Sequence, residues 1–197
     1  DIPFRKNEDF FKKDYFIELS KLILTPKNTN KFCCYVASRH MNFRQDFLKK
    51  ICNYKKVDSA GGAYNNYGSI KPGCQAKTNF QKDYKFAMAF ENRVADGYTT
   101  EKILHAYMSN CIPIYWGNDN VELDFNKETM IWVRDYGSVE QAIEYIKKVD
   151  NDEELYNSYM NKPIFSKTWI DRFTDPEEKF FKNVVNEIIG KPILKIT

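Results

Sequence analysis

The segment FAMAFENRVADGYTTEKILHAYMSNCIPIYWG, residues 86–117, decides the fold of this chain. It reads as a buried strand ending in Phe-Glu-Asn, a turn built on Gly97, a helix opening at Thr99–Thr100, and a second apolar strand ending at Gly117. This order is typical of a parallel sheet built from strand–helix units. Open parallel sheets bind ligands at the carboxyl ends of their strands, so we expect the turn before the helix to lie at the ligand-binding edge.

Polar side chains gather at the mouth of this helix. The first N–H groups of a helix lack intrahelical partners and carry a partial positive charge, which favours an anion. Lys102 adds a full positive charge, Glu101 can accept hydrogen bonds from hydroxyls, and Tyr98 lies just upstream. Phosphate together with sugar hydroxyls is the surface of a sugar nucleotide. The alternative is an ordinary surface pair, Glu101–Lys102, on an amphipathic helix.

Three basic residues compete for the phosphate: Arg39, Arg44 and Lys102. Arg44 falls in the first turns of the helix predicted after the first strand, so it can reach the same sheet edge as Lys102. Arginine binds two phosphate oxygens as a fork, whereas lysine is a point charge. The alternative for Arg44 is a solvated helix face. Glu91 and Asn92 end the first strand of the segment and are expected to project into the same crevice, or else to cap the turn.

Composition narrows the function classes. The 197 residues are 43% hydrophobic, enough for a proper core, and the 30 basic and 27 acidic residues are too evenly balanced to indicate a nucleic-acid binder. The two histidines, His40 and His105, have no partner at metal-ligand spacing, so no metal site is predicted. Five cysteines without a CxxC pair favour free thiols, and no apolar run is long enough to cross a membrane.

The rest of the chain supplies further strand–helix units. A strand is predicted at 31–38 and a helix at 42–54, and helices follow at 138–149 and 151–163 around a short strand at 130–136. Residues 57–73 are rich in Gly, Asn and Ser and are predicted to be an irregular loop, without a G-x-G-x-x-G or P-loop signature. The fold class is α/β, a Rossmann-like parallel sheet flanked by helices.

Three regions follow from this pattern. Residues 1–29 form an amphipathic helical segment, residues 30–165 the Rossmann-like domain, and residues 166–197 a helical tail. The tail contains an amphipathic helix at 175–189, which we expect to pack across the back of the domain, with peripheral contact to a membrane as the alternative. The chain opens on Asp1 rather than Met, which suggests a cut-down protein.

Three linked motifs carry a family resemblance. FEN at residues 90–92, GYTTEKI at 97–103 and IPIYWG at 112–117 stand in order and at close spacing. Together they resemble the α-1,3/4-fucosyltransferase family, glycosyltransferase family 10. The resemblance implies a GT-B fold, in which two Rossmann-like domains face each other across a cleft. This chain would be the C-terminal half, which binds the donor GDP-fucose.

The resemblance also assigns roles to individual residues. Arg44 and Lys102 match positions that contact the diphosphate, Tyr98 and Glu101 match positions at the sugar and ribose groups of the donor, and Asn92 matches a neighbouring polar position. Position 99 is threonine where many relatives carry valine, which is acceptable at a helix start because hydroxyls help there. No cofactor and no metal are implied.

The same resemblance implies an inverting transfer of L-fucose to a glycan hydroxyl, forming an α-1,3 or α-1,4 fucoside on an N-acetyllactosamine-type acceptor. The general base of such enzymes belongs to the acceptor-binding N-terminal domain, and residues 1–29 are too short to form one. We therefore expect a donor-domain fragment with no catalytic base of its own; the alternative is a non-catalytic GDP-sugar-binding module. A bacterial enzyme that decorates lipopolysaccharide or protein, cytoplasmic or peripheral at the inner membrane face, fits the Lys/Asn/Phe/Ile/Tyr-rich composition.

Overall fold

A computed structural model describes residues 13–174 of the chain, with side chains for residues 17–173. Its centre is a five-stranded sheet in the order β2-β1-β3-β4-β5, and every neighbouring pair is parallel. The strands are β1 (Lys31–Val36), β2 (Val57–Ala60), β3 (Tyr84–Phe90), β4 (Ile112–Trp116) and β5 (Ile131–Trp132). The predicted Rossmann-like α/β sheet is confirmed.

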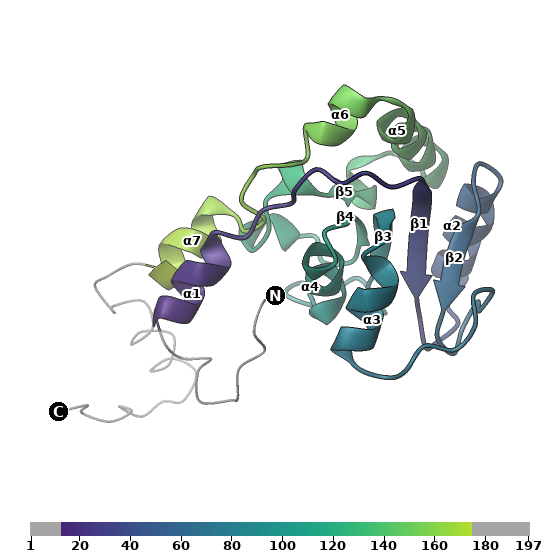
Figure 1. The fold of residues 1–197 in the computed structure, drawn as a ribbon, viewed down its shortest axis with the longest axis horizontal. Helices are drawn as coiled ribbons and strands as arrows, with labels where there is room; N and C mark the ends of the chain where they lie inside the picture. Colours follow the sequence, from purple (N-terminus) through teal and green to yellow (C-terminus); the bar gives the residue numbers. More distant parts are fainter. Residues whose placement is uncertain (1–12, 175–197) are drawn as a thin grey trace.

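Helices cover both faces of the sheet (Figure 1). They are α1 (Lys13–Ser20), α2 (Asn42–Cys52), α3 (Cys74–Gln81), α4 (Glu101–Met108), α5 (Val139–Asn151), α6 (Glu153–Asn157) and α7 (Lys167–Thr174), with 3₁₀ turns η2 (Val121–Leu123), η3 (Lys127–Thr129) and η4 (Val133–Asp135). Helices α3 and α4 pack together on one face, and α2 and α5 on the other. The central strands are therefore buried on both sides, which explains their continuous apolar sequences.

The prediction that residues 57–73 are irregular is wrong at their start. Residues 57–60 form the edge strand β2, which pairs with β1 in the register Cys33↔Val57 to Val36↔Ala60. Its sequence, VDSA, is short, and its hydrogen bonds come partly from a side chain in the following loop. The Asn66 amide accepts from the Ser59 N–H at 2.8 Å and donates to the Val57 carbonyl at 2.9 Å. Such support from a distant asparagine leaves no periodic signal in the strand itself.

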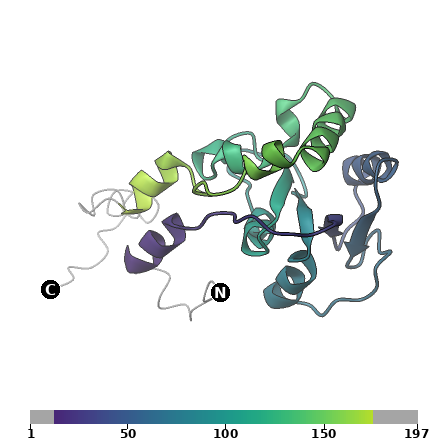
Figure 2. The same ribbon diagram turned by 45° about the horizontal axis from the view of Figure 1, so that its top comes forward.

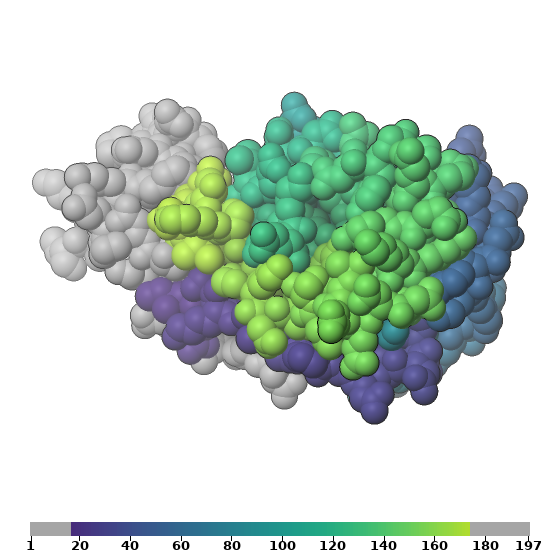
Figure 3. Space-filling model, turned by 90° about the horizontal axis from the view of Figure 1, so that it is seen from above, coloured from purple at the N-terminus to yellow at the C-terminus, as the bar shows by residue number. Residues whose placement is uncertain are grey.

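The segments before and after the sheet lie against each other. Helices α1 and α7 lie side by side at one end of the molecule (Figure 2), and α7 falls within the region 166–197 that is predicted to be a helical tail. The extended chain between α1 and β1 binds the segment after α6, because the Asn161 N–H donates to the Leu24 carbonyl at 2.8 Å and the Ile164 N–H to the Leu22 carbonyl at 3.0 Å. In Figure 3 this purple segment borders the green surface of α5 and α6.

Two expectations concern regions that the structure covers only partly or not at all. The predicted amphipathic helix at 175–189 lies outside the described residues, as do residues 1–12 of the N-terminal segment. Among the helices at residues 13–174, none has the length and apolar character needed to cross a membrane.

Candidate ligand-binding site at the carboxyl edge of the sheet

From β1 the chain adds β2 on one side of the sheet, and it then crosses back to add β3, β4 and β5 on the other side. The direction of strand addition therefore reverses between β1 and β3. Helix α2 leaves β1 towards β2, and α4 leaves β3 towards β4, so the two helices cover opposite faces of the sheet. Their amino ends both lie at the carboxyl edge, on either side of the end of β3. In open α/β sheets this reversal point is where the crevice for a ligand forms. Arg44 belongs to α2 and Lys102 to α4, so the reversal brings the two predicted cations to the same strand end.

Arg44 is buried, with only 2% of its surface exposed, so the solvated helix face considered from the sequence is wrong. Its Nη2 donates to the Phe90 carbonyl at 2.6 Å and to Asn92 Oδ1 at 2.7 Å. Nε is buried without a hydrogen-bond partner among residues 13–174. A guanidinium has five N–H donors, and Nη2 supplies two of them. Arg44 is thus fixed by one nitrogen, while Nε and Nη1 donate no hydrogen bond within the described residues.

Lys102 contacts a fully buried carboxylate, that of Glu91 at the end of β3. The Lys102 ammonium lies 2.9 Å from Glu91 Oε2 and donates to Thr100 Oγ1 at 2.7 Å. The same carboxylate accepts the Thr100 N–H at 2.7 Å and approaches the Thr100 hydroxyl at 2.8 and 2.9 Å. An ammonium has three N–H donors, so one donor of Lys102 stays uncommitted within this part of the chain.

The turn before α4 has the predicted form. Gly97 has a φ of 69°, in the left-handed region that favours glycine, and α4 begins at Glu101 with Thr100 as its N-cap residue. Asn118, which follows β4, fixes the turn from the other side. Its Oδ1 accepts the Gly97 N–H at 3.1 Å, and its Nδ2 donates to the Thr99 hydroxyl at 3.0 Å. The Thr99 hydroxyl is therefore used at the helix start, as a partner of Asn118.

Two further predicted site residues, Tyr98 and Glu101, lie in the turn and at the first position of α4. Glu101 is exposed, and its nearest ion partner is Lys77 of α3 at 3.8 Å. Burial acts to raise the pKa of Glu101, but Lys102, the N–H groups of the helix start, Thr100 and Lys77 together hold that pKa below its ordinary value. Glu101 is therefore ionised at neutral pH and accepts hydrogen bonds only. The half-buried Tyr98 carries the Arg93 guanidinium 5.1 Å from its ring centre.

Sequence reasoning underrated two residues of this site. The sequence places Glu91 in the crevice or at the turn but does not indicate its contact with Lys102, and it gives Asn118 no role. The glycine that ends the IPIYWG motif, Gly117, is the sequence signal for the buried position of Glu91. A Cβ at Gly117 would lie 2.6 Å from Glu91 Cγ and 2.7 Å from the Tyr115 hydroxyl. The final glycine of the third motif therefore makes room for the glutamate of the first. Asn118 follows that glycine directly.

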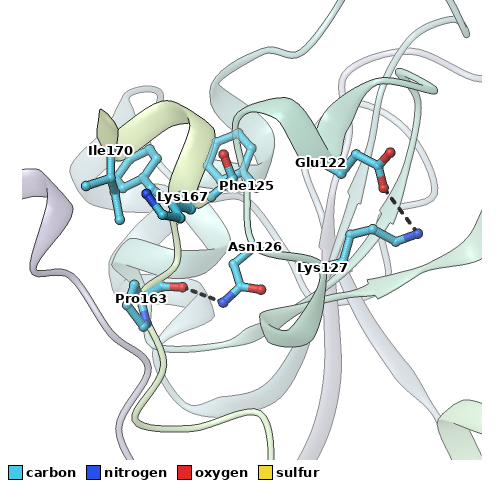
Figure 4. A pocket seen from close by; sticks show the side chains of 9 residues that line it. Glu122, Phe125, Asn126, Lys127, Pro163, Lys167 and Ile170 are labelled. Atoms are coloured by element: carbon cyan, nitrogen blue, oxygen red, sulfur yellow. Dashed lines mark hydrogen bonds and ion pairs between the residues drawn. The ribbon is translucent and has the colours of Figure 1, made fainter. Parts of the chain in front are cut away.

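Other features of the described residues lie away from this edge. A groove of about 360 Å³ opens between the segment 122–127 and the start of α7 (Figure 4), and none of the five predicted site residues lines it. His105 is buried in α4, and burial lowers its pKa. Within residues 13–174 there is no cluster of three or more His, Cys, Asp or Glu side chains that would hold a metal ion.

Comparison with known proteins gives a consistent result. The family model "Glycosyltransferase family 10 (fucosyltransferase) C-term" matches residues 25–181. An alpha-(1,3)-fucosyltransferase of Helicobacter pylori is 36% identical over 64% of this chain and 26% of its own length. An alpha-(1,4)-fucosyltransferase of Arabidopsis thaliana is 28% identical over 68% of this chain and 37% of its own length.

Solved structures agree with the sequence relatives. A crystal structure of an alpha1,3-fucosyltransferase with GDP-fucose superimposes with a TM-score of 0.66 and 30% identity, over 79% of this chain and 47% of that one. A second, with GDP, gives a TM-score of 0.67. The chain spans about half the length of these solved proteins and less of the curated relatives.

Proposed function

The chain belongs to glycosyltransferase family 10, and from this membership we propose that its sheet edge binds GDP-fucose as the donor end of a fucosyltransferase. The observation that carries the proposal is the pair of cations at the end of β3. Arg44 and Lys102 come from opposite faces of the sheet, and both contact the stretch Phe90–Asn92. Each keeps N–H donors that no described residue uses, as a diphosphate ligand requires.

The remaining predicted residues take complementary roles in this proposal. Asn92 fixes Arg44 through its amide oxygen, so its effect on the ligand passes through the arginine. The exposed, ionised Glu101 accepts hydrogen bonds from ribose or fucose hydroxyls. Tyr98 lies on the same turn and borders the sugar. The N-termini of α2 and α4 add the partial positive charge of their free N–H groups.

The reaction we propose is a single displacement at the anomeric carbon of GDP-β-L-fucose. A glycan hydroxyl attacks, the bond to the diphosphate breaks, and an α-1,3 or α-1,4 fucoside forms with inversion. Arg44 and Lys102 offset the negative charge that builds on the departing GDP, which is a preorganised electrostatic role, and the proposal includes no metal or other cofactor. The proton of the hydroxyl passes to a general base that the family resemblance assigns to an acceptor-binding domain.

The acceptor and the location of the enzyme extend this proposal. We take the acceptor to be a glycan of the N-acetyllactosamine type, and the site of action to be the cytoplasm or the inner face of a bacterial membrane. The support is the family membership for the first and the residue composition for the second. A transfer assay with N-acetyllactosamine and cell fractionation test the two statements separately.

Calorimetric titration with GDP-fucose tests the binding step. We expect the unaltered chain to bind, Lys102→Ala to lose detectable binding, and Arg44→Lys to bind at least about tenfold more weakly because it keeps the charge but not the fork. Lys127→Ala, at the remote groove, is the matched control and should bind normally. Circular dichroism checks that each variant is folded. If Lys102→Ala bound GDP-fucose with unchanged affinity, the assignment of Lys102 to the phosphate site would be wrong.

A further inference from the structure

The contacts of Glu91 go beyond those of a helix cap. A usual N-cap side chain accepts the N–H of the second or third helical residue, yet Thr100, the N-cap residue of α4, makes no such bond. Instead a carboxylate from the preceding strand binds the N–H and hydroxyl of Thr100 and the ammonium of Lys102. One fully buried group thus connects the strand end, the turn and the cation.

We propose that Glu91 is the positioning residue for phosphate recognition: it holds Lys102 and the turn at residues 97–100 in the geometry that a diphosphate needs, without touching the ligand. The inference rests on the proposed function, because it names how the same site is kept in shape. Two of the three N–H donors of Lys102 are fixed, by Glu91 and Thr100, which aims the third. A lysine on a flexible stem would otherwise lose more side-chain entropy on binding a ligand.

Charge gives the inference its test. The Glu91 carboxylate is an anionic group, and its Oε2 lies 2.9 Å from the ammonium of Lys102, the residue proposed to bind the phosphate. If electrostatic attraction alone governed binding, removal of this carboxylate would strengthen the binding of GDP, because the site would become more positive. If Glu91 acts by position, its removal weakens binding although the site becomes more positive. The two explanations predict opposite signs.

Glu91→Gln keeps the size of the side chain and removes its charge. We expect about tenfold weaker binding of GDP, the size of one lost charged hydrogen bond, and unchanged binding of guanosine, which has no phosphate. Calorimetry measures GDP and ligand-observed NMR measures guanosine. GDP affinity equal to or tighter than that of the unaltered chain would overturn the inference, and so would an equal loss for GDP and guanosine, which would indicate general distortion.

Asp150→Asn is the matched control. Asp150 is a buried carboxylate with two lysine partners, Lys55 and Lys85, in contact with the amino end of the sheet, so its loss perturbs folding in a similar way far from the site. Its affinity for GDP should equal that of the unaltered chain. If Glu91→Gln does not fold, the pair Thr100→Val and Thr100→Ser replaces it. We expect the valine variant, without the bridging hydroxyl, to lose GDP affinity and the serine variant to keep it; equal affinity in both would overturn the inference.

The outcome also separates this inference from the proposed function. A chain that binds neither GDP nor GDP-fucose before any substitution contradicts the proposed function. A chain that binds GDP normally, with a Glu91→Gln variant that binds it as well or better, contradicts only the role of Glu91.

Discussion

Two buried carboxylates at opposite edges of the sheet meet lysines, and their surroundings differ. Asp150, at the end of α5, is 2% exposed in its side chain and binds Lys55 at 2.5 Å, Lys85 at 3.0 Å and the Tyr54 hydroxyl at 2.8 Å. Glu91, at the carboxyl end of β3, binds one lysine and one threonine. Both are buried charges that need partners to offset the cost of leaving water.

The two clusters differ in where they lie on the sheet and in what packs against their lysines. The two lysines of the Asp150 cluster also lie over aromatic rings, Lys55 5.8 Å from the centre of Phe32 and Lys85 5.3 Å from that of Tyr156. This cluster ties the turn after α2, the start of β3 and the end of α5 together at the amino edge. At the carboxyl edge, Lys102 and Arg44 instead lie beside the end of β3, at the point between β1 and β3 where open α/β sheets bind ligands. The same chemistry therefore serves cohesion at one edge and, in our proposal, a ligand at the other.

The largest expected effect on stability comes from Asp150→Asn. It leaves Lys55 and Lys85 without their carboxylate, and because both lysines are partly exposed we expect a loss of about 2–3 kcal/mol, below the range for a fully buried pair. Urea unfolding followed by circular dichroism measures it. If the comparison is right, GDP affinity does not change. A loss of GDP binding in this variant would break the distinction between the two edges.

The pH dependence of stability tests the role of Asp150 in a second way. Burial acts to raise the pKa of Asp150, but Lys55, Lys85 and Tyr54 hold that pKa below its ordinary value. A carboxyl with a lowered pKa in the folded state stabilises the protein above its unfolded pKa, near 3.9, and loses this contribution as pH falls through the folded pKa. The stability difference between the unaltered chain and Asp150→Asn should therefore be constant from pH 7 to about 5 and shrink below it. A difference that grows towards pH 3 would contradict the assignment.

The sequence predicts the features of the fold that depend on neighbouring residues better than those that depend on contacts between residues far apart in the chain. The strands β3 and β4 and the turn at Gly97 are local: a buried apolar run, a glycine and a helix start lie within one segment, and they were predicted correctly. The pairing of Glu91 with Lys102 spans eleven residues but depends on how far the helix start turns back on the strand. The spacing of apolar residues in the sequence does not indicate the angle between the start of α4 and β3.

The features that escaped prediction depend on distant partners. Strand β2 is completed by Asn66, and the burial of Arg44 depends on Phe90 and Asn92, forty-six and forty-eight residues further along the chain. Taken alone, an arginine in the first turn of a helix favours solvent, and only the neighbouring strand end supplies its acceptors. Arg44 illustrates why the motifs could identify a site while its internal contacts had to come from the fold.

A smaller perturbation tests whether the carboxyl edge needs the position of Glu91. Gly117→Ala would place a Cβ 2.6 Å from Glu91 Cγ, so the carboxylate must move. We expect a loss of about 1–2 kcal/mol in stability, together with weaker GDP binding. Gly137→Ala is the control: its Cβ would meet the Gln141 amide oxygen at 2.8 Å, the end of an exposed and flexible side chain that can turn away. Equal effects of the two variants on GDP affinity would indicate that displacement of Glu91 is irrelevant.

The smallest effect concerns the turn itself, apart from the carboxylate. Gly97 has a φ of 69° and open space where a Cβ would lie, so Gly97→Ala meets backbone strain and no clash. We expect a cost of about 1 kcal/mol, and about half of it in Gly97→Asn, since asparagine adopts this conformation more readily. Because Glu91 and Asn118 hold the turn from two sides, the strained backbone should stay in place and GDP affinity should fall less than in Gly117→Ala. A larger loss of affinity in Gly97→Ala than in Gly117→Ala would mean that the turn, rather than the buried glutamate, governs the shape of the site.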